Sequence, residues 1–378
     1  MKQSIYIEAR NTLINSFKDS LKIKENEYQH GQLNMVSAAL VNYLPDIDTS
    51  AHEEIYKNIL LHKKLSILEQ STYDSLEYVE MENLSPEILT QLKSKPTIIC
   101  TFHTGSYRLL NLFLINNKIP FSLVIGKDIA EQEGASFHNQ YNTLTRNNDA
   151  ADFSIIDAEK PNVGLQMLRE LKKGRSLVLY MDGNTGAGAA TTKNDNRCVV
   201  NFLNQQLFAR KGIAFLAHAA NVPIIIAASY RKSWEQIRLK FFDPIIPDTK
   251  IERGEFAEAA TQQIYNMVAP IIKQYPEQWE AWLYIHKVAN IVNSNKDLQK
   301  SKRRSVVSGK ICLDSFQFGI FKLNGAPILL RKNSYSFYEI NHQLYNLLSS
   351  CNETPINREA LDDALFNQLY EQGVVQYQ

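Results

Sequence analysis

The spacing of hydrophobic residues changes once along this chain, near residue 95. Before that point apolar positions recur three and four residues apart, as at Leu76 and Val79 or at Ile55 and Ile59, which predicts a mostly helical, polar region over residues 1–95. After it, short apolar runs of strand length alternate with helical patterns. The expected strands are 96–102, 121–125, 153–156, 176–180, 222–228 and 237–242, and the helices between them are 107–116, 162–173 and 210–221.

This alternation predicts an α/β fold, in which a mixed, largely parallel sheet has helices on its faces. A further helical pattern over 251–274 would close this core, which we expect to span residues 96–292. Residues 293–309 are polar and basic and are expected to form a solvated linker; the alternative interpretation is a nucleic-acid-binding patch.

Beyond the linker, residues 310–378 predict a small α+β module. Apolar runs at 316–323 and 327–331 flank Asn324-Gly325, a pair that tolerates positive φ and favours a hairpin turn. A third strand at 336–340 would precede helices at 341–350 and 358–372. Gly373 would end the last helix before a short terminal strand.

Composition excludes several classes of protein. With 41 Lys+Arg, 40 Asp+Glu and 44% hydrophobic residues, the chain is neither disordered in general nor charged enough to attract nucleic acid over its whole surface. Its four cysteines are far apart with no Cys-x-x-Cys pair, which argues against a disulfide framework or a zinc site. No secretory signal or apolar run of membrane-spanning length occurs, so we expect a cytoplasmic protein with no transmembrane segment. The eight histidines show no metal-ligand spacing, so no metal is expected.

The first candidate for chemistry is His103, in Cys100-Thr-Phe-His-Thr-Gly-Ser-Tyr-Arg108 directly after a strand of buried type. Histidine can act as a general base near neutral pH, although a lone histidine is more often structural. Gly105 would allow close backbone approach, and a helix beginning near Tyr107 would offer N–H groups, from Ser106 onward, to an anion.

The second candidate is Asp182, which follows another strand and leads through Gly183 and Asn184 into a glycine-rich loop. Ligands collect at the carboxyl ends of strands in open α/β sheets, so a carboxylate there is a candidate functional group. The glycines at 186 and 188 are too few for a dinucleotide loop, and a flexible turn is an equal alternative.

Two further segments carry weaker indications. Arg210 and Lys211 precede an alanine-rich helix and could hold a phosphate or carboxylate; a solvated helix start explains them equally well. Trp279 and Trp282 lie three residues apart after Tyr275-Pro-Glu-Gln, which would place them on one face of a helix and is typical of two side chains packed in a core.

Taken together, these segments resemble the lysophospholipid acyltransferase superfamily, and within it the lipid A biosynthesis (lauroyl/myristoyl) acyltransferases. The resemblance covers roughly residues 95–290 and includes a weak match at Arg146. It implies a glycerolipid acyltransferase-like core in which His103 deprotonates a hydroxyl or amine that attacks a thioester. Asp182 would be a strand-end residue of the same site, orienting the histidine or the acceptor. Helix-end N–H groups would stabilise the oxyanion.

The chain departs from this family at the fifth position after the histidine. The family carries an acid there, which orients the imidazole, whereas this chain has Arg108. Either another carboxylate takes the role, with Asp182 our first choice and Glu133 a distant second, or the chemistry has changed or been lost. Arg108 could instead bind a substrate carboxylate or a pantetheine phosphate.

Two more departures concern the ends of the chain. The family's N-terminal apolar helix is missing, so the acceptor would be soluble or carrier-bound. The C-terminal module, with Phe318-x-x-Phe, Asn324-Gly and Tyr338-x-x-Asn341, resembles the winged-helix-like peptide-binding domain of pyrroloquinoline quinone biosynthesis. That resemblance implies a peptide partner bound along an exposed strand edge.

The sequence therefore predicts an acyltransferase of secondary metabolism that moves an acyl, aminoacyl or peptidyl group from a thioester to a hydroxyl or amine. The donor would be an acyl or peptidyl carrier protein or acyl-CoA, with no other cofactor. Two alternatives stay open: a binding or scaffold protein on the same fold, and a hydrolase that releases a carrier-bound chain. No Gly-x-Ser-x-Gly motif occurs, which disfavours a serine hydrolase of that type.

Overall fold

A computed structural model describes residues 5–145, 153–183, 196–292 and 309–378. By its contacts the chain divides into two compact units. Unit 1 comprises Met1–Lys18, Asn58–Phe202 and Leu207–Ala281, and unit 2 comprises Asp19–Lys57, Leu203–Gln206 and Trp282–Gln378. The helical N-terminal region thus contributes segments to both units.

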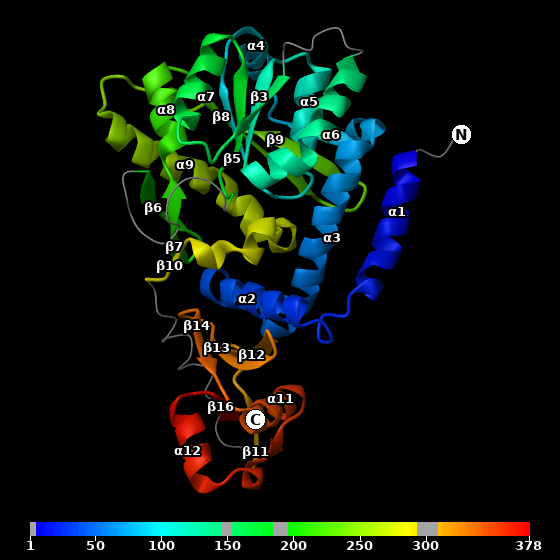
Figure 1. Cartoon of the computed structure of the whole chain (residues 1–378), viewed down its shortest axis with the longest axis vertical. Coiled ribbons are helices and arrows are strands. Elements are labelled where there is room, and N and C mark those ends of the chain that lie inside the picture. The colour runs from blue at the N-terminus through cyan, green and yellow to red at the C-terminus, as the bar shows by residue number, and fades with distance from the viewer. Residues whose placement is uncertain (1–4, 146–152, 184–195, 293–308) are drawn as a thin grey trace. The chain divides into compact units, whose positions relative to one another are not determined.

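Unit 1 is built on a seven-stranded sheet with the order β1-β9-β8-β2-β5-β3-β4 (Figure 1). All neighbouring strands in it are parallel except β8 and β9, which are antiparallel. The predicted α/β class with a mixed, largely parallel sheet is therefore confirmed. The strands are β1 (Val79–Glu82), β2 (Ile98–Thr101), β3 (Phe121–Ile125), β4 (Phe153–Asp157), β5 (Ser176–Tyr180), β8 (Ile224–Arg231) and β9 (Ile237–Phe241).

Helices flank this sheet, and apolar side chains from both form the core of unit 1. Strands β2, β3 and β8 are buried along their whole length, as expected for a sheet covered on both faces. The helices are α1 (Ile5–Phe17), α3 (His52–Ser71, which runs from unit 2 into unit 1), α4 (Pro86–Ser94), α5 (Leu109–Asn116), α6 (Lys127–Thr145), α7 (Val163–Lys172), α8 (Gly212–Ala220) and α9 (Arg253–Gln274).

The register of two adjacent strands positions the candidate site. Strands β2 and β5 are parallel neighbours, with Thr101 opposite Tyr180, and the Met181 N–H donates to the Thr101 carbonyl (2.9 Å). His103 and Asp182 each lie two residues beyond their strand, so both emerge at the same edge of the sheet.

The structure differs from the predicted elements at three places near that edge. Residues 197–210 form a hairpin of β6 (Arg197–Phe202) and β7 (Gln205–Arg210), so Arg210 ends a strand rather than beginning a helix. Helix α5 begins at Leu109, two residues late, because the loop before it turns through Gly105 at a φ of 54°. Trp279 is extended between the 3₁₀ turns η4 (Pro276–Gln278) and η5 (Glu280–Leu283).

Unit 2 combines the helix α2 (Glu27–Tyr43) with the C-terminal residues. Helix α2 packs against β12 of an antiparallel sheet, β12-β13-β14. The predicted turn at Asn324-Gly325 is confirmed, with φ of 50° and 80°. Further elements are β12 (Phe318–Leu323), β13 (Ala326–Arg331), β14 (Ser336–Glu339), β11 (Lys310–Leu313), β15 (Ile356–Asn357), β16 (Val375–Tyr377), α11 (His342–Glu353), α12 (Asp363–Glu371) and the short β10 (Ala289–Asn290).

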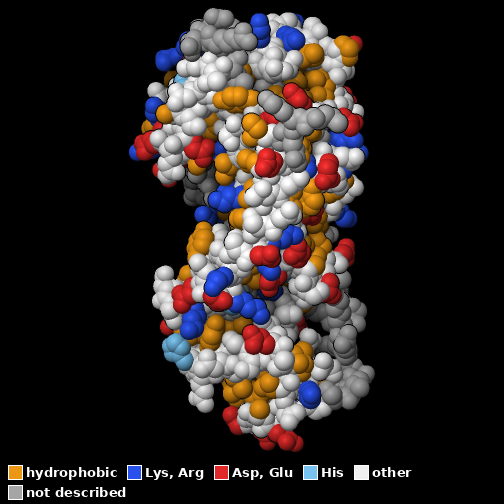
Figure 2. All heavy atoms as spheres, turned by 90° about the vertical axis from the view of Figure 1, so that its right-hand side faces the viewer, with side chains coloured by type: hydrophobic (Ala, Val, Ile, Leu, Met, Phe, Trp, Pro, Cys, Tyr) orange, Lys and Arg blue, Asp and Glu red, His pale blue; other side chains and the backbone are white. Residues whose placement is uncertain are grey.

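The surface agrees with the balanced composition of the chain. On the face shown in Figure 2, basic, acidic and hydrophobic side chains lie intermixed. Within the described ranges, no helix is both long and apolar enough to cross a membrane.

Candidate functional site

The candidate site is centred on a contact between His103 and Asp182. The His103 Nδ1 lies 2.8 Å from Asp182 Oδ1, and the His103 backbone N–H donates to Asp182 Oδ2 (2.9 Å). The Asp182 side chain is 2% exposed, whereas the imidazole is 20% exposed. A buried carboxylate therefore holds a histidine whose ring is still accessible.

A third donor completes the surroundings of Asp182. The indole Nε1 of Trp279 donates to Asp182 Oδ2 at 2.6 Å, and Trp279 is 1% exposed. Every contact named here brings an N–H group to the carboxylate, and hydrogen bonds of this charge-assisted kind are short and strong.

Two tyrosine rings enclose the imidazole of His103. Tyr180 stacks on it with ring centroids 4.5 Å apart, and Tyr107 meets it edge-on at 4.9 Å. Burial lowers the pKa of His103, but the charge and hydrogen bond of Asp182 outweigh it, so this pKa lies above the ordinary 6.5. Glu280 also raises the pKa, while Arg108 lowers it.

Arg108, the residue in place of the family's acid, is engaged with other side chains. Its Nη1 donates to Glu133 Oε2 (2.7 Å) and to Gln70 Oε1 (2.6 Å). Glu133, the less favoured of the two carboxylates expected beside His103, therefore forms an ion pair with Arg108. The carboxylate that contacts His103 is that of Asp182.

A second charged pair borders the site. Glu280 accepts hydrogen bonds from Lys63 Nζ (2.6 Å) and from the Tyr107 hydroxyl (3.2 Å). Burial and the charge of Glu280 raise the pKa of Tyr107, so this phenol stays protonated at neutral pH.

The loop that carries His103 has little conformational freedom. Gly105 has a φ of 54°, and a Cβ there would lie 2.8 Å from Tyr230 Cα and 2.9 Å from the Ser229 carbonyl oxygen. A larger residue would therefore strain the turn and clash with the backbone of β8.

The backbone N–H groups of this loop are already in use. That of Gly105 donates to the Gln278 carbonyl (2.9 Å), and that of Ser106 donates to Ser229 Oγ (3.2 Å). Both groups therefore fix the loop to its neighbours, although the sequence predicted close backbone approach at Gly105 and an anion at the N–H groups from Ser106 onward.

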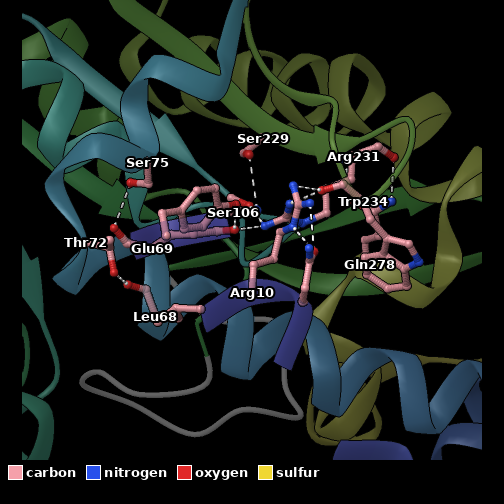
Figure 3. Close-up of polar contacts among 12 residues, drawn as sticks. Arg10, Leu68, Glu69, Thr72, Ser75, Ser106, Ser229, Arg231, Trp234 and Gln278 are labelled. Atoms are coloured by element: carbon pink, nitrogen blue, oxygen red, sulfur yellow. Dashed lines mark hydrogen bonds and ion pairs between the residues drawn. The ribbon is translucent and has the colours of Figure 1, made fainter. Parts of the chain in front are cut away.

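A buried polar network binds the loop through Ser106 (Figure 3). Arg231 on β8 forms an ion pair with Glu69 on α3, and its Nη2 also donates to Ser106 Oγ (2.7 Å). The Gln278 side chain bonds both backbone groups of Arg231, at 2.7 and 2.8 Å. The network joins α3, β8 and the segment around Trp279 to the histidine loop.

His103 lines a cavity of about 920 Å³ within unit 1. Most of the described lining is apolar, with contributions from the ends of β3 and β5 and from helices α6, α7 and α8; examples are Leu123, Ile125, Phe137, Leu168, Leu179 and Leu216. Among the described lining residues, cationic side chains outnumber carboxylates: Lys63, Arg108, Lys160, Arg197, Arg210 and Arg253 against Glu133 and Glu280. The cavity is suited to a ligand that has an apolar part and a negative charge.

The residues singled out from the sequence fall into three groups. His103, Arg108, Gly183 and Arg210 line the cavity, with Asp182 directly behind His103. Gly105, Ser106 and Lys211 are outside the lining that the structure describes; the Lys211 ammonium pairs with Glu258 (2.8 Å). Arg146 and Asn184 lie outside the described residues.

Sequence reasoning missed several residues that border His103. Tyr180 is the last residue of β5, so strand-end position could have indicated it. Trp279 was interpreted as core, and it is buried, but it also binds Asp182. No local pattern indicates Lys63 or Glu280, because their proximity depends on how α3 and the segment after α9 pack.

This arrangement can perform acid–base chemistry at the wall of an apolar cavity. With Nδ1 on the Asp182 carboxylate, the other ring nitrogen of His103 is the one that can accept a proton from a ligand. Comparison of the chain with protein-family models and with curated proteins finds no match.

Proposed function

We propose that this protein is an acyltransferase that moves an acyl, aminoacyl or peptidyl group from a thioester to a hydroxyl or amine. The observation that carries the proposal is the His103–Asp182 pair at the wall of the large apolar cavity. The pair supplies a base with an orienting carboxylate, and the cavity supplies room for an acyl chain.

In the proposed reaction, His103 Nε2 takes the proton from the acceptor O–H or N–H as the oxygen or nitrogen attacks the thioester carbonyl. The tetrahedral intermediate then collapses, the C–S bond breaks, and the leaving sulfur takes the proton from the imidazolium. Asp182 keeps the ring in the required tautomer and stabilises the imidazolium. Because the N–H groups of Gly105 and Ser106 are engaged, the proposal assigns them no part in oxyanion binding.

The donor is proposed to be a carrier-protein or CoA thioester. Its acyl chain would occupy the apolar part of the cavity, and its phosphate would bind the cationic side chains that include Arg210. The sequence resemblance of roughly residues 95–290 to lipid A acyltransferases implies a donor of this kind. The exchange of the family's acid for Arg108 is accommodated if Asp182 takes its place.

The catalytic part of the proposal is tested by intact-mass spectrometry. Full-length protein is incubated with a carrier-bound acyl thioester and a panel of amines and alcohols. We expect the acyl mass to move from carrier to acceptor with the wild type and not with His103→Ala. His138→Ala is the matched control, since His138 is in the same unit but its Nδ1 bonds the Gly134 carbonyl on α6 (2.9 Å).

The other outcomes of this experiment favour the alternatives. Loss of the acyl group from the carrier without an acylated acceptor would indicate hydrolysis. Equal behaviour of the wild type and His103→Ala, with folding unchanged by circular dichroism, would contradict the proposal and favour a binding protein.

The donor site is tested separately with coenzyme A in isothermal titration calorimetry. Arg210→Gln is expected to weaken binding about tenfold, because it removes a charge from the cavity wall. Lys211→Gln is the matched control, and a change of at most about twofold is expected, because its ammonium pairs with Glu258. Equal losses of coenzyme A affinity in the two variants would contradict the proposal that the cavity binds the donor.

For unit 2 we propose that β14 binds a peptide partner along its edge. β14 is the last strand of the β12-β13-β14 sheet, and Phe337 and Tyr338 on it are 48% and 46% exposed. Such an edge can accept an added strand. Slower hydrogen exchange at residues 336–339 is expected when a peptidyl-loaded carrier is added, and unchanged exchange would contradict this part of the proposal.

A further inference from the structure

We infer that Trp279 is a positioning residue, whose indole N–H holds the Asp182 carboxylate in the orientation that faces His103. The hydrogen bond from Nε1 to Asp182 Oδ2 is 2.6 Å long, and both side chains are almost fully buried. The other carboxylate oxygen, Oδ1, contacts His103 Nδ1 at 2.8 Å. Oδ2 also accepts the His103 backbone N–H at 2.9 Å, so each carboxylate oxygen contacts a ring nitrogen and Oδ2 has a backbone donor in addition.

The backbone fixes Trp279 relative to the histidine. Thr104 and Trp279 form an antiparallel bridge between the histidine loop and the segment after α9. The Glu280 N–H donates to the His103 carbonyl (2.8 Å), and the Gly105 N–H donates to the Gln278 carbonyl (2.9 Å). The residues on both sides of Trp279 are therefore tied to the residues on both sides of Thr104.

The indole itself is held by ring packing. Phe202 of β6 lies against it, with ring centroids 5.2 Å apart. Since the indole N–H is a donor only, it can stabilise a carboxylate but cannot accept a proton from one. The contact therefore holds the carboxylate by a hydrogen bond without competing with His103 for a proton.

Loss of this N–H has a predictable effect on the imidazole. Without the indole N–H, the buried Asp182 carboxylate has fewer hydrogen-bond donors. This loss destabilises the pair more when His103 is neutral than when His103 is an imidazolium, because the imidazolium offsets the charge of the carboxylate. The proton affinity of the pair then increases. Removal of the Asp182 charge itself has the opposite effect: it lowers the pKa of His103, because the burial of the imidazole is then the larger influence.

The experiment is a titration of ¹³C-labelled histidine in the full-length protein by NMR, with the His103 signal assigned by its loss in His103→Gln. Trp279→Phe is expected to raise the pKa of His103 by about half to one unit. Trp282→Phe is the matched control, since it removes an indole that is also buried but belongs to unit 2. That variant is expected to leave the pKa within about 0.2 unit.

A second replacement separates the N–H group from the ring. Benzothienylalanine, incorporated at position 279, keeps the size of the indole but has sulfur in place of N–H. It is expected to raise the pKa as Trp279→Phe does, and it covers the case in which the smaller ring prevents folding. An unchanged pKa in the benzothienylalanine protein would overturn the inference and leave Trp279 as a packing residue.

The consequence for catalysis rests on the proposed function, but the titration does not. If transfer occurs, the acidic limb of its pH–rate profile should move to higher pH in both position-279 proteins, as the pKa of His103 rises. A shifted pKa in a protein without transfer would retain the positioning role and contradict the acyltransferase proposal. Transfer in a benzothienylalanine protein whose His103 pKa is unchanged would support the acyltransferase proposal and contradict the positioning role of Trp279.

Discussion

His103 in unit 1 is partly buried and Lys332 in unit 2 is buried, and burial alone lowers the pKa of each. Asp182 reverses this effect at His103, whose pKa lies above 6.5. At Lys332, which is 4% exposed, burial dominates and lowers the pKa to about 7. The difference lies in the partners of the two groups.

The partners of Lys332 are neutral oxygens. Its Nζ donates to Ser37 Oγ and to the Ser315 carbonyl, each at 2.6 Å. The charge of Asp314 acts on it in the opposite direction to burial, but that carboxylate accepts hydrogen bonds from the backbone and side chain of Gln317. Neutral oxygens accept hydrogen bonds from the ammonium but carry no charge to offset its lost hydration, whereas the Asp182 carboxylate supplies an opposite charge to His103. The pKa is therefore lowered at Lys332 and not at His103.

The largest expected effect comes from removing the carboxylate at His103. Asp182→Asn should lower the transfer rate about a hundredfold to ten-thousandfold, because the imidazole loses its orientation and the charge that stabilises the imidazolium. It should also lower the pKa of His103, so that the acidic limb moves to lower pH. Steady-state rates over a pH series and the NMR titration check both; an unmoved limb would show that Asp182 does not act on His103.

The next effect concerns the buried ion pair of unit 1. Glu69→Gln should leave Arg231 buried beside a neutral amide and lower the free energy of unfolding by about 3–5 kcal/mol. Glu82→Gln is the control, because Glu82 pairs with Lys240 at a more exposed position and should cost at most about 1 kcal/mol. Urea denaturation measures both. Equal costs would mean that burial does not decide the strength of these pairs.

Lys332 provides the converse test in unit 2. Because its folded pKa of about 7 lies below its unfolded value, the unfolded chain binds more protons between those two pKa values, and stability rises with pH in that range. The slope is about 1.4 kcal/mol per pH unit. Lys332→Met should abolish this rise. Urea denaturation at pH 7, 8 and 9 measures it, and an equal slope in wild type and variant would contradict it.

The smallest expected effect comes from one neutral partner of Lys332. Ser37→Ala removes a hydroxyl that accepts from Lys332 and contacts His52 Nδ1 (2.7 Å), at a cost of about 1 kcal/mol. Since the ammonium loses an acceptor, the pKa of Lys332 should fall further. Denaturation at pH 7 measures the loss, and the same substitution in the Lys332→Met protein is the reference. A smaller loss is expected there, because the hydroxyl then has no ammonium to bind and keeps only its contact with His52.

Much of the fold near the site could be predicted from local pattern. Residues 176–180 and 121–125 were predicted as strands with the bounds that β5 and β3 have, because buried parallel strands are continuous apolar runs. The β6–β7 hairpin was missed. Its turn includes Leu203, which has a φ of 53°. Turns with positive φ usually contain glycine or asparagine at that position, so a leucine there gives no typical sequence signal for a hairpin between β6 and β7.

The sequence by itself determined the position of His103 and Asp182, each two residues beyond an apolar strand, since strand ends follow from the hydrophobic pattern. Only the tertiary structure decided that β2 and β5 are neighbours, which brings the two side chains to 2.8 Å. It also decided that Glu133 binds Arg108 and that Trp279 donates to Asp182, 97 residues away in sequence. Contacts between distant segments depend on the packing of whole elements, which no local pattern of residues encodes.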